Sequence, residues 1–201
     1  TELWPTQSYM IWANNSGGFA VAYLNITVID QLPSVSYLPS ALILTNNTAS
    51  NDLPLAPSIN GPGEITSWKL NNTMLPTGMS FGANNGTFYG TPTQLWPETS
   101  YRIWANNSGG SSPAIVTIKV VDQLPTLTYN PENLTLLNNT QSSSLPLGPS
   151  LTGSGIILEW GITDGLPNGL NFGNDNGTIW GIPTERMNRT NFTIWANNSG
   201  G

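Results

Sequence analysis

The stretch IWANNSGG at residues 11–18 recurs at residues 103–110 and again at residues 194–201. Its spacing decides the architecture, because the opening isoleucines follow one another after 92 and then 91 residues. A period of this size is the length of one small domain and exceeds the roughly 20–50 residues of a solenoid unit. The chain of 201 residues is therefore a tandem array of about two domains.

The similarity between copies continues well beyond this stretch. LPTGMSFGANNGTFYGTP at 75–92 matches LPNGLNFGNDNGTIWGIP at 166–183, and DQLP occurs at 30–33 and 122–125. Each DQLP ends an alternating apolar run with a proline that cannot donate to a strand ladder, so we place domain borders there. We predict the last two strands of a preceding domain at 1–30, a complete domain at 34–122 and a domain at 126–201 that lacks its final strand.

Short alternating strands dominate the pattern. Turn residues recur every eight to twelve residues, and no stretch sustains a helical period. Where charged and polar residues share one parity of a strand, the other parity is expected to face the core. The expected inward residues are Leu24, Ile26, Val28, Tyr101, Ile103, Ala105, Val116, Ile118 and Val120. The predicted fold is all-β, with tandem antiparallel β-sandwiches of about 91–92 residues per repeat.

The glycine and proline motif of each copy resembles the Ig-like repeat of the He_PIG type, which is cadherin-like in architecture. The matching positions are Leu75, Pro76, Gly78, Phe81, Gly86, Gly90, Pro92 and Thr93, and Leu166, Pro167, Gly169, Phe172, Gly177, Gly181, Pro183 and Thr184. The resemblance covers nearly the whole chain. It implies tandem Ig-like modules in large microbial surface proteins, without implying a chemistry.

The composition excludes several classes of function. The chain has no histidine and no cysteine, and no pair of acidic residues is repeated from copy to copy, so we expect no enzyme and no catalytic residue. Asp30 and Asp122 recur singly, which is too few oxygen ligands for a cation, so we expect no metal, no interdomain Ca²⁺ and no cofactor. Five basic residues make nucleic acid an improbable partner, and no apolar run is long enough to span a membrane.

Sequons for N-glycosylation are more frequent than the composition explains, since chance would supply about five. A sugar coat would also supply the hydration that 8% charged residues cannot. The alternative is that NNS and NNT are hydrogen-bonding turns, which explains strand-borne Asn25 poorly. Dense glycosylation without cysteine predicts an exported protein, extracellular or on the cell surface, in an archaeal style. The acceptors are Asn14, Asn25, Asn46, Asn71, Asn85, Asn106, Asn133, Asn138, Asn176, Asn188, Asn191 and Asn197.

Three tryptophans recur with outward parity, namely Trp12, Trp104 and Trp195. Each is either covered by a loop or a neighbouring domain, or forms a contact site for another chain or a sugar ring. Trp68 and Trp160 also recur, and we expect them in the core.

The predicted function is a structural repeat of a heavily glycosylated filament, stalk or surface layer. Its rigid rod of Ig-like beads would contact adjacent repeats or copies of itself. The alternative is an adhesin or carbohydrate-binding module that uses the repeated tryptophans. A sandwich that lacks one strand has an open edge, which following residues or a strand from another copy would fill. Residues 1–30 carry two strands and would supply IWANNSGG twice, so the overlap favours a window of a longer array.

Overall fold

The computed structural model describes residues 3–61, 63–153 and 155–201, so the first two residues of the predicted segment 1–30 lie outside the described residues. These ranges contain β-strands and connecting segments but no helix. The chain divides into two compact units, Thr1–Lys119 and Val120–Gly201. The all-β prediction is confirmed.

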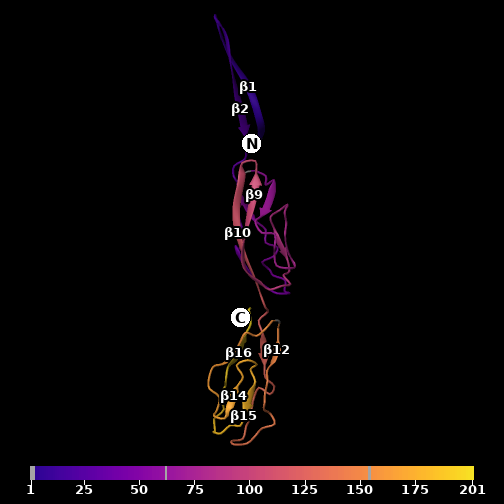
Figure 1. Ribbon diagram of the computed structural model, residues 1–201, viewed down its shortest axis with the longest axis vertical. Helices are drawn as coiled ribbons and strands as arrows, with labels where there is room; N and C mark the ends of the chain where they lie inside the picture. Colours follow the sequence, from indigo (N-terminus) through magenta and orange to yellow (C-terminus); the bar gives the residue numbers. More distant parts are fainter. Residues whose placement is uncertain (1–2, 62, 154) are drawn as a thin grey trace. The chain divides into compact units, whose positions relative to one another are not determined.

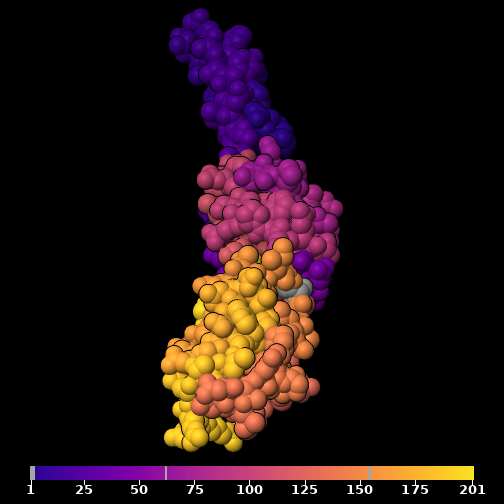
Figure 2. All heavy atoms as spheres, turned by 60° about the horizontal axis from the view of Figure 1, so that its bottom comes forward, coloured from indigo at the N-terminus to yellow at the C-terminus, as the bar shows by residue number. Residues whose placement is uncertain are grey.

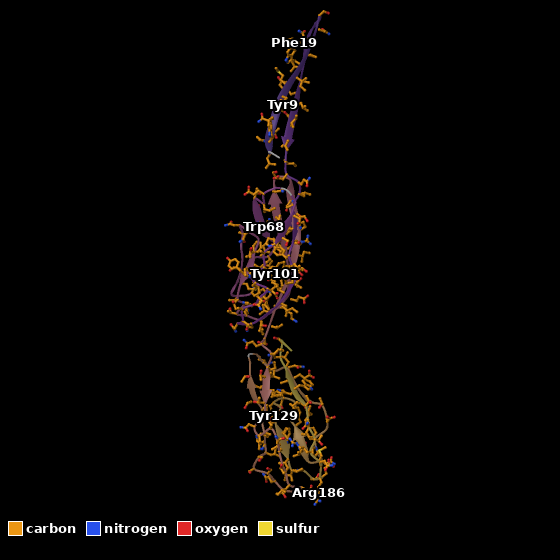
Figure 3. All side chains as sticks on the ribbon, turned by 180° about the vertical axis from the view of Figure 1, so that it is seen from behind. Tyr9, Phe19, Trp68, Tyr101, Tyr129 and Arg186 are labelled. Atoms are coloured by element: carbon orange, nitrogen blue, oxygen red, sulfur yellow. The ribbon has the colours of Figure 1, made fainter. Side chains whose placement is uncertain are left out.

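The first unit begins with a two-stranded hairpin formed by β1 (Trp4–Asn15) and β2 (Gly18–Val28) (Figure 1). The strands are antiparallel, and Tyr9 lies opposite Leu24. Every described residue of the hairpin is exposed, so the prediction that Leu24, Ile26 and Val28 face a core is wrong here, because the hairpin is a two-stranded sheet to which no other described strand pairs. Its indigo side chains are open to solvent in Figure 2, and Tyr9 and Phe19 mark it in Figure 3.

The rest of the first unit forms one larger sheet and two shorter strand pairs. The larger sheet has the order β4-β10-β9-β6, while β3 pairs with β5 and β7 pairs with β8. The long β9–β10 hairpin therefore lies at the centre of the sheet, between β4 and β6. The strands are β3 (Ser34–Ser36), β4 (Ala41–Thr45), β5 (Ser58–Asn60), β6 (Ser67–Leu70), β7 (Met79–Phe81), β8 (Phe88–Gly90), β9 (Trp96–Asn107) and β10 (Gly110–Val121).

The core of this unit follows the alternation seen in the sequence. Tyr101, Ile103, Ala105, Val116 and Ile118 are all fully buried, at 0% exposure. Their strand neighbours on the opposite parity are half-buried or exposed. The prediction of the inward faces of β9 and β10 is therefore confirmed.

Aromatic side chains pack against one another in this core, which contains Trp68 and Tyr101 (labelled in Figure 3). The Phe88 ring lies 5.9 Å from the Tyr37 ring, 5.0 Å from Phe81 and 6.2 Å from Tyr101. The Tyr37 hydroxyl donates to the carbonyl of Gly86 at 2.6 Å, and burial raises the pKa of Tyr37 far above its usual value. Trp68 is 8% exposed, so it lies in the core as expected.

The second unit repeats five of these strands at the same length, whereas β16, the counterpart of β9, has 4 residues in place of 12. The pairs are β11–β12, β13–β16 and β14–β15. Trp160 and Ile179 lie in its core, at 7% and 8% exposure. The Tyr129 hydroxyl donates to the carbonyl of Gly177, as Tyr37 does to Gly86. The strands are β11 (Thr126–Thr128), β12 (Ser150–Thr152), β13 (Glu159–Ile162), β14 (Leu170–Phe172), β15 (Ile179–Gly181) and β16 (Ile194–Asn197).

Candidate functional site: the NNSGG turn and the DQL segment

The NNSGG turn between β9 and β10 is hydrogen-bonded to residues 30–32, which we call the DQL segment. This segment precedes the first strand of the same sandwich. The Asn107 side chain is 9% exposed, and its Nδ2 donates to the carbonyl oxygen of Gln31 at 2.7 Å. Its Oδ1 accepts from the backbone N–H of Gly109 at 2.9 Å. One buried amide therefore shapes the turn and binds the DQL segment at the same time.

Ser108 makes the second pair of contacts. Its Oγ accepts from the backbone N–H of Asp30 at 2.8 Å and donates to Oδ2 of Asp30 at 2.7 Å. A hydroxyl can act as donor and acceptor together, and a bond to a carboxylate is stronger than one between neutral groups. The aspartate of DQLP is thus held by its main chain and its side chain.

The second unit repeats this arrangement one period later. Ser199 Oγ accepts from the Asp122 N–H at 2.8 Å and donates to Asp122 Oδ2 at 2.8 Å. Asn198 Nδ2 donates to the carbonyl oxygen of Gln123 at 2.6 Å. We call these two sets of contacts the clamps: residues 107–109 on 30–31, and residues 198–200 on 122–123.

Close backbone approach explains the glycines of the clamps. A Cβ on Gly109 would lie 2.0 Å from the carbonyl oxygen of Asp30, and one on Gly200 would lie 2.2 Å from that of Asp122. Gly63 and Gly155 make room for the carboxylates, because a Cβ there would lie 2.7 Å and 2.2 Å from the Cγ of Asp30 and Asp122, respectively. Only glycine leaves space for the DQL segment at these positions.

The clamps were not predicted from the sequence: Asp30 and Asp122 were considered only as cation ligands, and Asn-Asn-Ser as a sugar acceptor. The usable signal was that DQLP and NNSGG recur together with one period. Co-repetition of two distant motifs indicates a shared contact, but it does not say which atoms meet.

No group of three or more histidine, cysteine, aspartate or glutamate residues gathers to hold a metal in the described ranges. Within these same ranges, no helix has the length and apolar character needed to cross a membrane.

The structure places the twelve candidate acceptors at or near the surface. Asn46 and Asn106 are half-buried, and the other ten are exposed. Asn106 is the one whose Nδ2 is engaged, donating to Ser67 Oγ at 3.1 Å and to Ser67 O at 3.3 Å. Most of these asparagine side chains are therefore accessible to a glycan, and whether they carry one stays a prediction.

The sequons that recur in register also contain residues with structural roles. In the NNT turns, Asn47 and Asn139 adopt φ values of 56° and 55°, the left-handed region that asparagine tolerates. Asn85 and Asn176 accept from the N–H of Thr87 and Thr178 through Oδ1, at 3.1 Å and 3.0 Å. The repetition itself is therefore explained by turns and clamps. The independent case for sugars rests on the acceptors that do not repeat: Asn25, Asn71, Asn133, Asn188 and Asn191.

The three repeated tryptophans have different surroundings. Trp104 and Trp195 are half-buried on the outer side of their sheets, opposite Lys69 and Gly161. The Trp195 indole lies over Gly161, where a Cβ would come within 2.1 Å of the ring. Trp12 is 62% exposed.

Trp12 belongs to an apolar surface on the outer face of the hairpin, lined by Met10, Trp12, Asn14, Phe19 and Val21. The corresponding positions of the next repeat are Arg102, Trp104, Asn106, Ser111 and Pro113, which are more polar. This outer-face patch is therefore particular to the hairpin.

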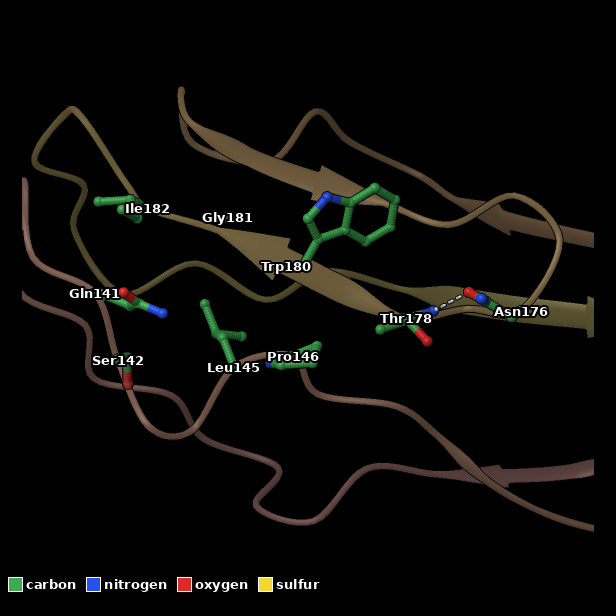
Figure 4. A pocket seen from close by; sticks show the side chains of 9 residues that line it. All are labelled: Gln141, Ser142, Leu145, Pro146, Asn176, Thr178, Trp180, Gly181 and Ile182. Atoms are coloured by element: carbon green, nitrogen blue, oxygen red, sulfur yellow. Dashed lines mark hydrogen bonds between the residues drawn. The ribbon is translucent and has the colours of Figure 1, made fainter.

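A shallow groove in the second unit presents another indole (Figure 4). Trp180 is 42% exposed and lines it together with Leu145, Pro146 and Ile182. Gln141 and Asn176 add uncharged polar groups, and the N–H of Thr178 donates to Asn176 Oδ1 beside it. The lining contains no ionisable side chain, so the groove offers apolar contact and hydrogen bonds only.

Known proteins similar to the chain include surface adhesins. It is 32% identical over 141 residues to the serine-rich adhesin for platelets of Staphylococcus aureus strains MRSA252 and USA300. The match covers 67% of this chain but only 10% and 6% of those proteins. The chain thus spans a tenth or less of the length of these curated relatives.

Solved structures to which the chain is similar include tandem Ig and cadherin domains. The I-band fragment I67-I69 from titin is 12% identical, with a TM-score of 0.46, and the match covers 96% of this chain and 73% of that one. Human CDH23 EC21-23 is 15% identical, with a TM-score of 0.41, and 96% and 69% of the two chains are covered.

The family is shown by a model that matches most of the chain. The He_PIG model, described as "Putative Ig domain", matches residues 32–121 and 125–201. Both segments begin within a DQLP motif; the first ends with β10, and the second includes the NNSGG turn that follows β16. The chain belongs to the He_PIG family of Ig domains.

Proposed function

We propose that the chain is a structural repeat of a heavily N-glycosylated extracellular filament, stalk or surface layer, in which Ig-like beads form a stiff rod and contact adjacent repeats or other copies. The resemblance to surface adhesins supports a cell-surface location. We propose no enzymatic role. The archaeal setting stays a prediction, and the adhesin relatives are bacterial.

The observation that carries the proposal is the repeated clamp. In each unit, the residues that enter the sandwich are hydrogen-bonded to a turn of that sandwich through main chain and side chain. Because its polar groups are hydrogen-bonded, the DQL segment has less conformational freedom than a flexible linker. A module built to carry load or keep its spacing needs such connections, whereas a catalytic domain has no need to repeat them.

Loss of one clamp hydroxyl is expected to destabilise the second unit. In Ser199→Ala, the Asp122 N–H and carboxylate lose their partner, and Asp122 is only 6% exposed. We expect the free energy of unfolding of this unit to fall by about 1–2 kcal/mol. Hydrogen exchange of β11 and β16 would measure this loss of stability. The protein should be made without a glycosylation system, because the variant also removes the Asn197 sequon.

Ser16→Ala is the matched control. Ser16 occupies the same place in the NNSGG turn of the hairpin, and its Oγ makes no hydrogen bond to another described residue. We expect Ser16→Ala to leave the free energy of unfolding unchanged. An equal effect of both variants would mean that the serine acts through the turn and not through aspartate.

Dense glycosylation is the part of the proposal that accounts for the low charge. Carrying only 8% charged residues, the surface needs another source of hydration. Sugars on the exposed acceptors would provide this hydration, and these acceptors occur in both units, including the hairpin of the first. The hydrogen-bonded Nδ2 of Asn106 makes this position the least suited to modification after folding.

Peptide mapping by mass spectrometry of protein from its native source would test this part. We expect added hexoses at the exposed acceptors Asn25, Asn188 and Asn191. Asn84 is exposed but lies outside any sequon, so it serves as the unmodified control. Bare asparagine at all three acceptors would remove the glycan from the proposal and leave the structural repeat.

An adhesin or carbohydrate-binding module is the second candidate, and the outer-face patch of the hairpin favours it. Trp12 is 62% exposed and Phe19 is 74% exposed, in a setting with no charged side chain. Exposed indole faces stack on sugar rings and on apolar partner surfaces. The groove beside Trp180 has a similar character.

Glycan-array binding would separate the two candidates. If the chain binds sugars through this patch, Trp12→Ala is expected to weaken binding at least tenfold, because it removes the stacking platform. Leu38→Ala is the control, since Leu38 is 89% exposed and lies outside the patch. A wild-type chain that binds no glycan, together with filaments in electron micrographs, would rule out the adhesin candidate.

A further inference from the structure

The groove beside Trp180 contains an attachment point for a sugar. Asn176 lines this groove and opens a sequon that ends at Thr178. The Asn176 side chain is fixed by its turn, because its Oδ1 accepts from the N–H of Thr178 at 3.0 Å. Its Nδ2, the atom that an N-glycan modifies, makes no hydrogen bond to another residue of the described ranges. The amide is therefore held in place while its modifiable nitrogen is unengaged.

The Trp180 indole lies beside this amide. Both groups border Gly173, where an added Cβ would lie 2.2 Å from Asn176 Oδ1 and 3.2 Å from Cζ3 of the indole. These two atoms are therefore at most 5.4 Å apart, the sum of 2.2 Å and 3.2 Å. A sugar linked to Asn176 thus begins next to an indole that is 42% exposed.

The groove continues from this point past the indole (Figure 4). In that view Asn176 lies at one end of the lining and Gln141 at the other, with Leu145 and Trp180 between them. The lining combines apolar side chains with uncharged hydrogen-bonding groups and contains no ionisable side chain. A neutral sugar chain has the same combination, because its rings present C–H groups on their faces and hydroxyls around their rims.

The first unit pairs a sequon with an exposed aromatic side chain in the same way. Asn85 Oδ1 accepts from the N–H of Thr87 at 3.1 Å, and Tyr89 is 47% exposed. Gly82 makes room for this amide as Gly173 does in the second unit, since a Cβ on Gly82 would lie 2.1 Å from Asn85 Oδ1. The arrangement is therefore a property of the repeat, and the second unit carries the larger aromatic ring.

We propose that a neutral oligosaccharide attached to Asn176 lies in this groove, with its inner rings stacked on the Trp180 indole and its outer hydroxyls hydrogen-bonded to Gln141. The C–H faces of the sugar cover apolar surface that is otherwise open to water. The inference rests on the proposed glycosylation and adds the place where one of the sugars lies.

Covalent attachment explains how a shallow groove can hold a sugar. A tethered ligand acts at an effective concentration in roughly the millimolar range, so one stacking contact and a few hydrogen bonds are sufficient. A free sugar lacks this advantage and would have to displace the attached chain. The groove thus serves the modification of this chain itself.

A double-mutant cycle tests the contact, on the whole chain made in a host with N-glycosylation machinery. Thr178→Val removes the sequon but keeps the shape of the side chain and the N–H that donates to Asn176. Trp180→Thr removes the indole and keeps a β-branched residue in the strand. In the proteins that retain the sequon, the fraction with a sugar on Asn176 is measured.

Hydrogen exchange at two amides next to the groove is the readout. The N–H of Leu147 donates to the carbonyl oxygen of Ile179 at 2.9 Å, and the N–H of Ile182 donates to that of Gly169 at 3.0 Å. Both amides exchange when the strands around the groove open, which a seated sugar opposes. Neither residue adjoins a substituted position, so their intrinsic exchange rates stay the same.

We expect Thr178→Val to speed this exchange by about threefold to tenfold when the indole is present, the range that an aromatic stacking contact gives. In the Trp180→Thr background, loss of the sequon should leave the exchange unchanged. Trp180→Tyr introduces the aromatic type of the first unit and should retain most of the effect. Equal acceleration with and without the indole, or no acceleration in either case, would overturn the proposal.

Peptide mapping of the same protein separates this proposal from the wider one. Sugar on Asn188 together with a bare Asn176 would overturn the seated sugar alone. Bare asparagine at both positions would overturn the proposed glycosylation as well. Sugar on Asn176 with an effect on exchange that requires Trp180 would support both.

Discussion

Phe88→Ala is expected to lower the free energy of unfolding of the first unit by about 3–5 kcal/mol, the range for truncating a buried phenylalanine. Phe88 is 0% exposed, and its ring contacts those of Tyr37, Phe81 and Tyr101. Alanine would remove all three ring contacts and leave a cavity between the strands. Since small β-domains are stable by about 5–15 kcal/mol, this is a large fraction of the total.

Tyr89→Ala provides the control for this prediction. Tyr89 is the next residue of β8 and points to the other face, where it is 47% exposed. We expect a change below about 1 kcal/mol. Denaturant unfolding followed by hydrogen exchange would assign the loss to the first unit. Equal effects of the two variants would mean that β8 acts through its backbone and not through the Phe88 ring.

Gly181→Ala is expected to destabilise the second unit by on the order of 3 kcal/mol. Gly181 has a φ of 122°, which disfavours any side chain, and a Cβ there would lie 2.1 Å from the carbonyl oxygen of Gly169. That oxygen belongs to the backbone and accepts from Ile182 at 3.0 Å, so it cannot move away freely. The substitution combines backbone strain with the disruption of β14–β15.

Gly165→Ala is the matched control in the same unit. Its φ is ordinary, and no atom lies within 4 Å of an added Cβ. We expect unchanged or slightly higher stability, because alanine restricts the unfolded chain more than glycine does. Thermal unfolding by calorimetry would compare the two. A Gly181→Ala protein as stable as the wild type would contradict this steric explanation.

Much of the fold was predictable, and the inward faces of β9 and β10 show why. Strand alternation is a local property, so Tyr101, Ile103 and Val116 could be placed in the core without knowledge of their neighbours. Trp68 was placed correctly as well, from its recurrence and from the core role common in such sandwiches.

The site was less predictable, and the NNS sequons show the limit. The NNS sequons were assigned to sugars, which stays a prediction, and the structure adds direct contacts of Asn107 and Ser108 with residues 30 and 31. Asp30 and Ser108 are 78 positions apart, and no local pattern says which polar groups meet over that distance. Asn25 is exposed, but so is every described residue of the hairpin, so its exposure does not test the predicted parity.

By itself, the sequence determined the period of the array, the all-β class and the buried parity of the long strands, because each follows from spacing within or between copies. Tertiary structure alone decided what IWANNSGG does and how far its strand extends. In the second unit the same eight residues form a short strand with one partner, whereas in the first they belong to the long β9–β10 hairpin. The physical reason is that a strand's hydrogen bonds belong equally to its neighbour, so its extent and its contacts depend on residues elsewhere in the chain.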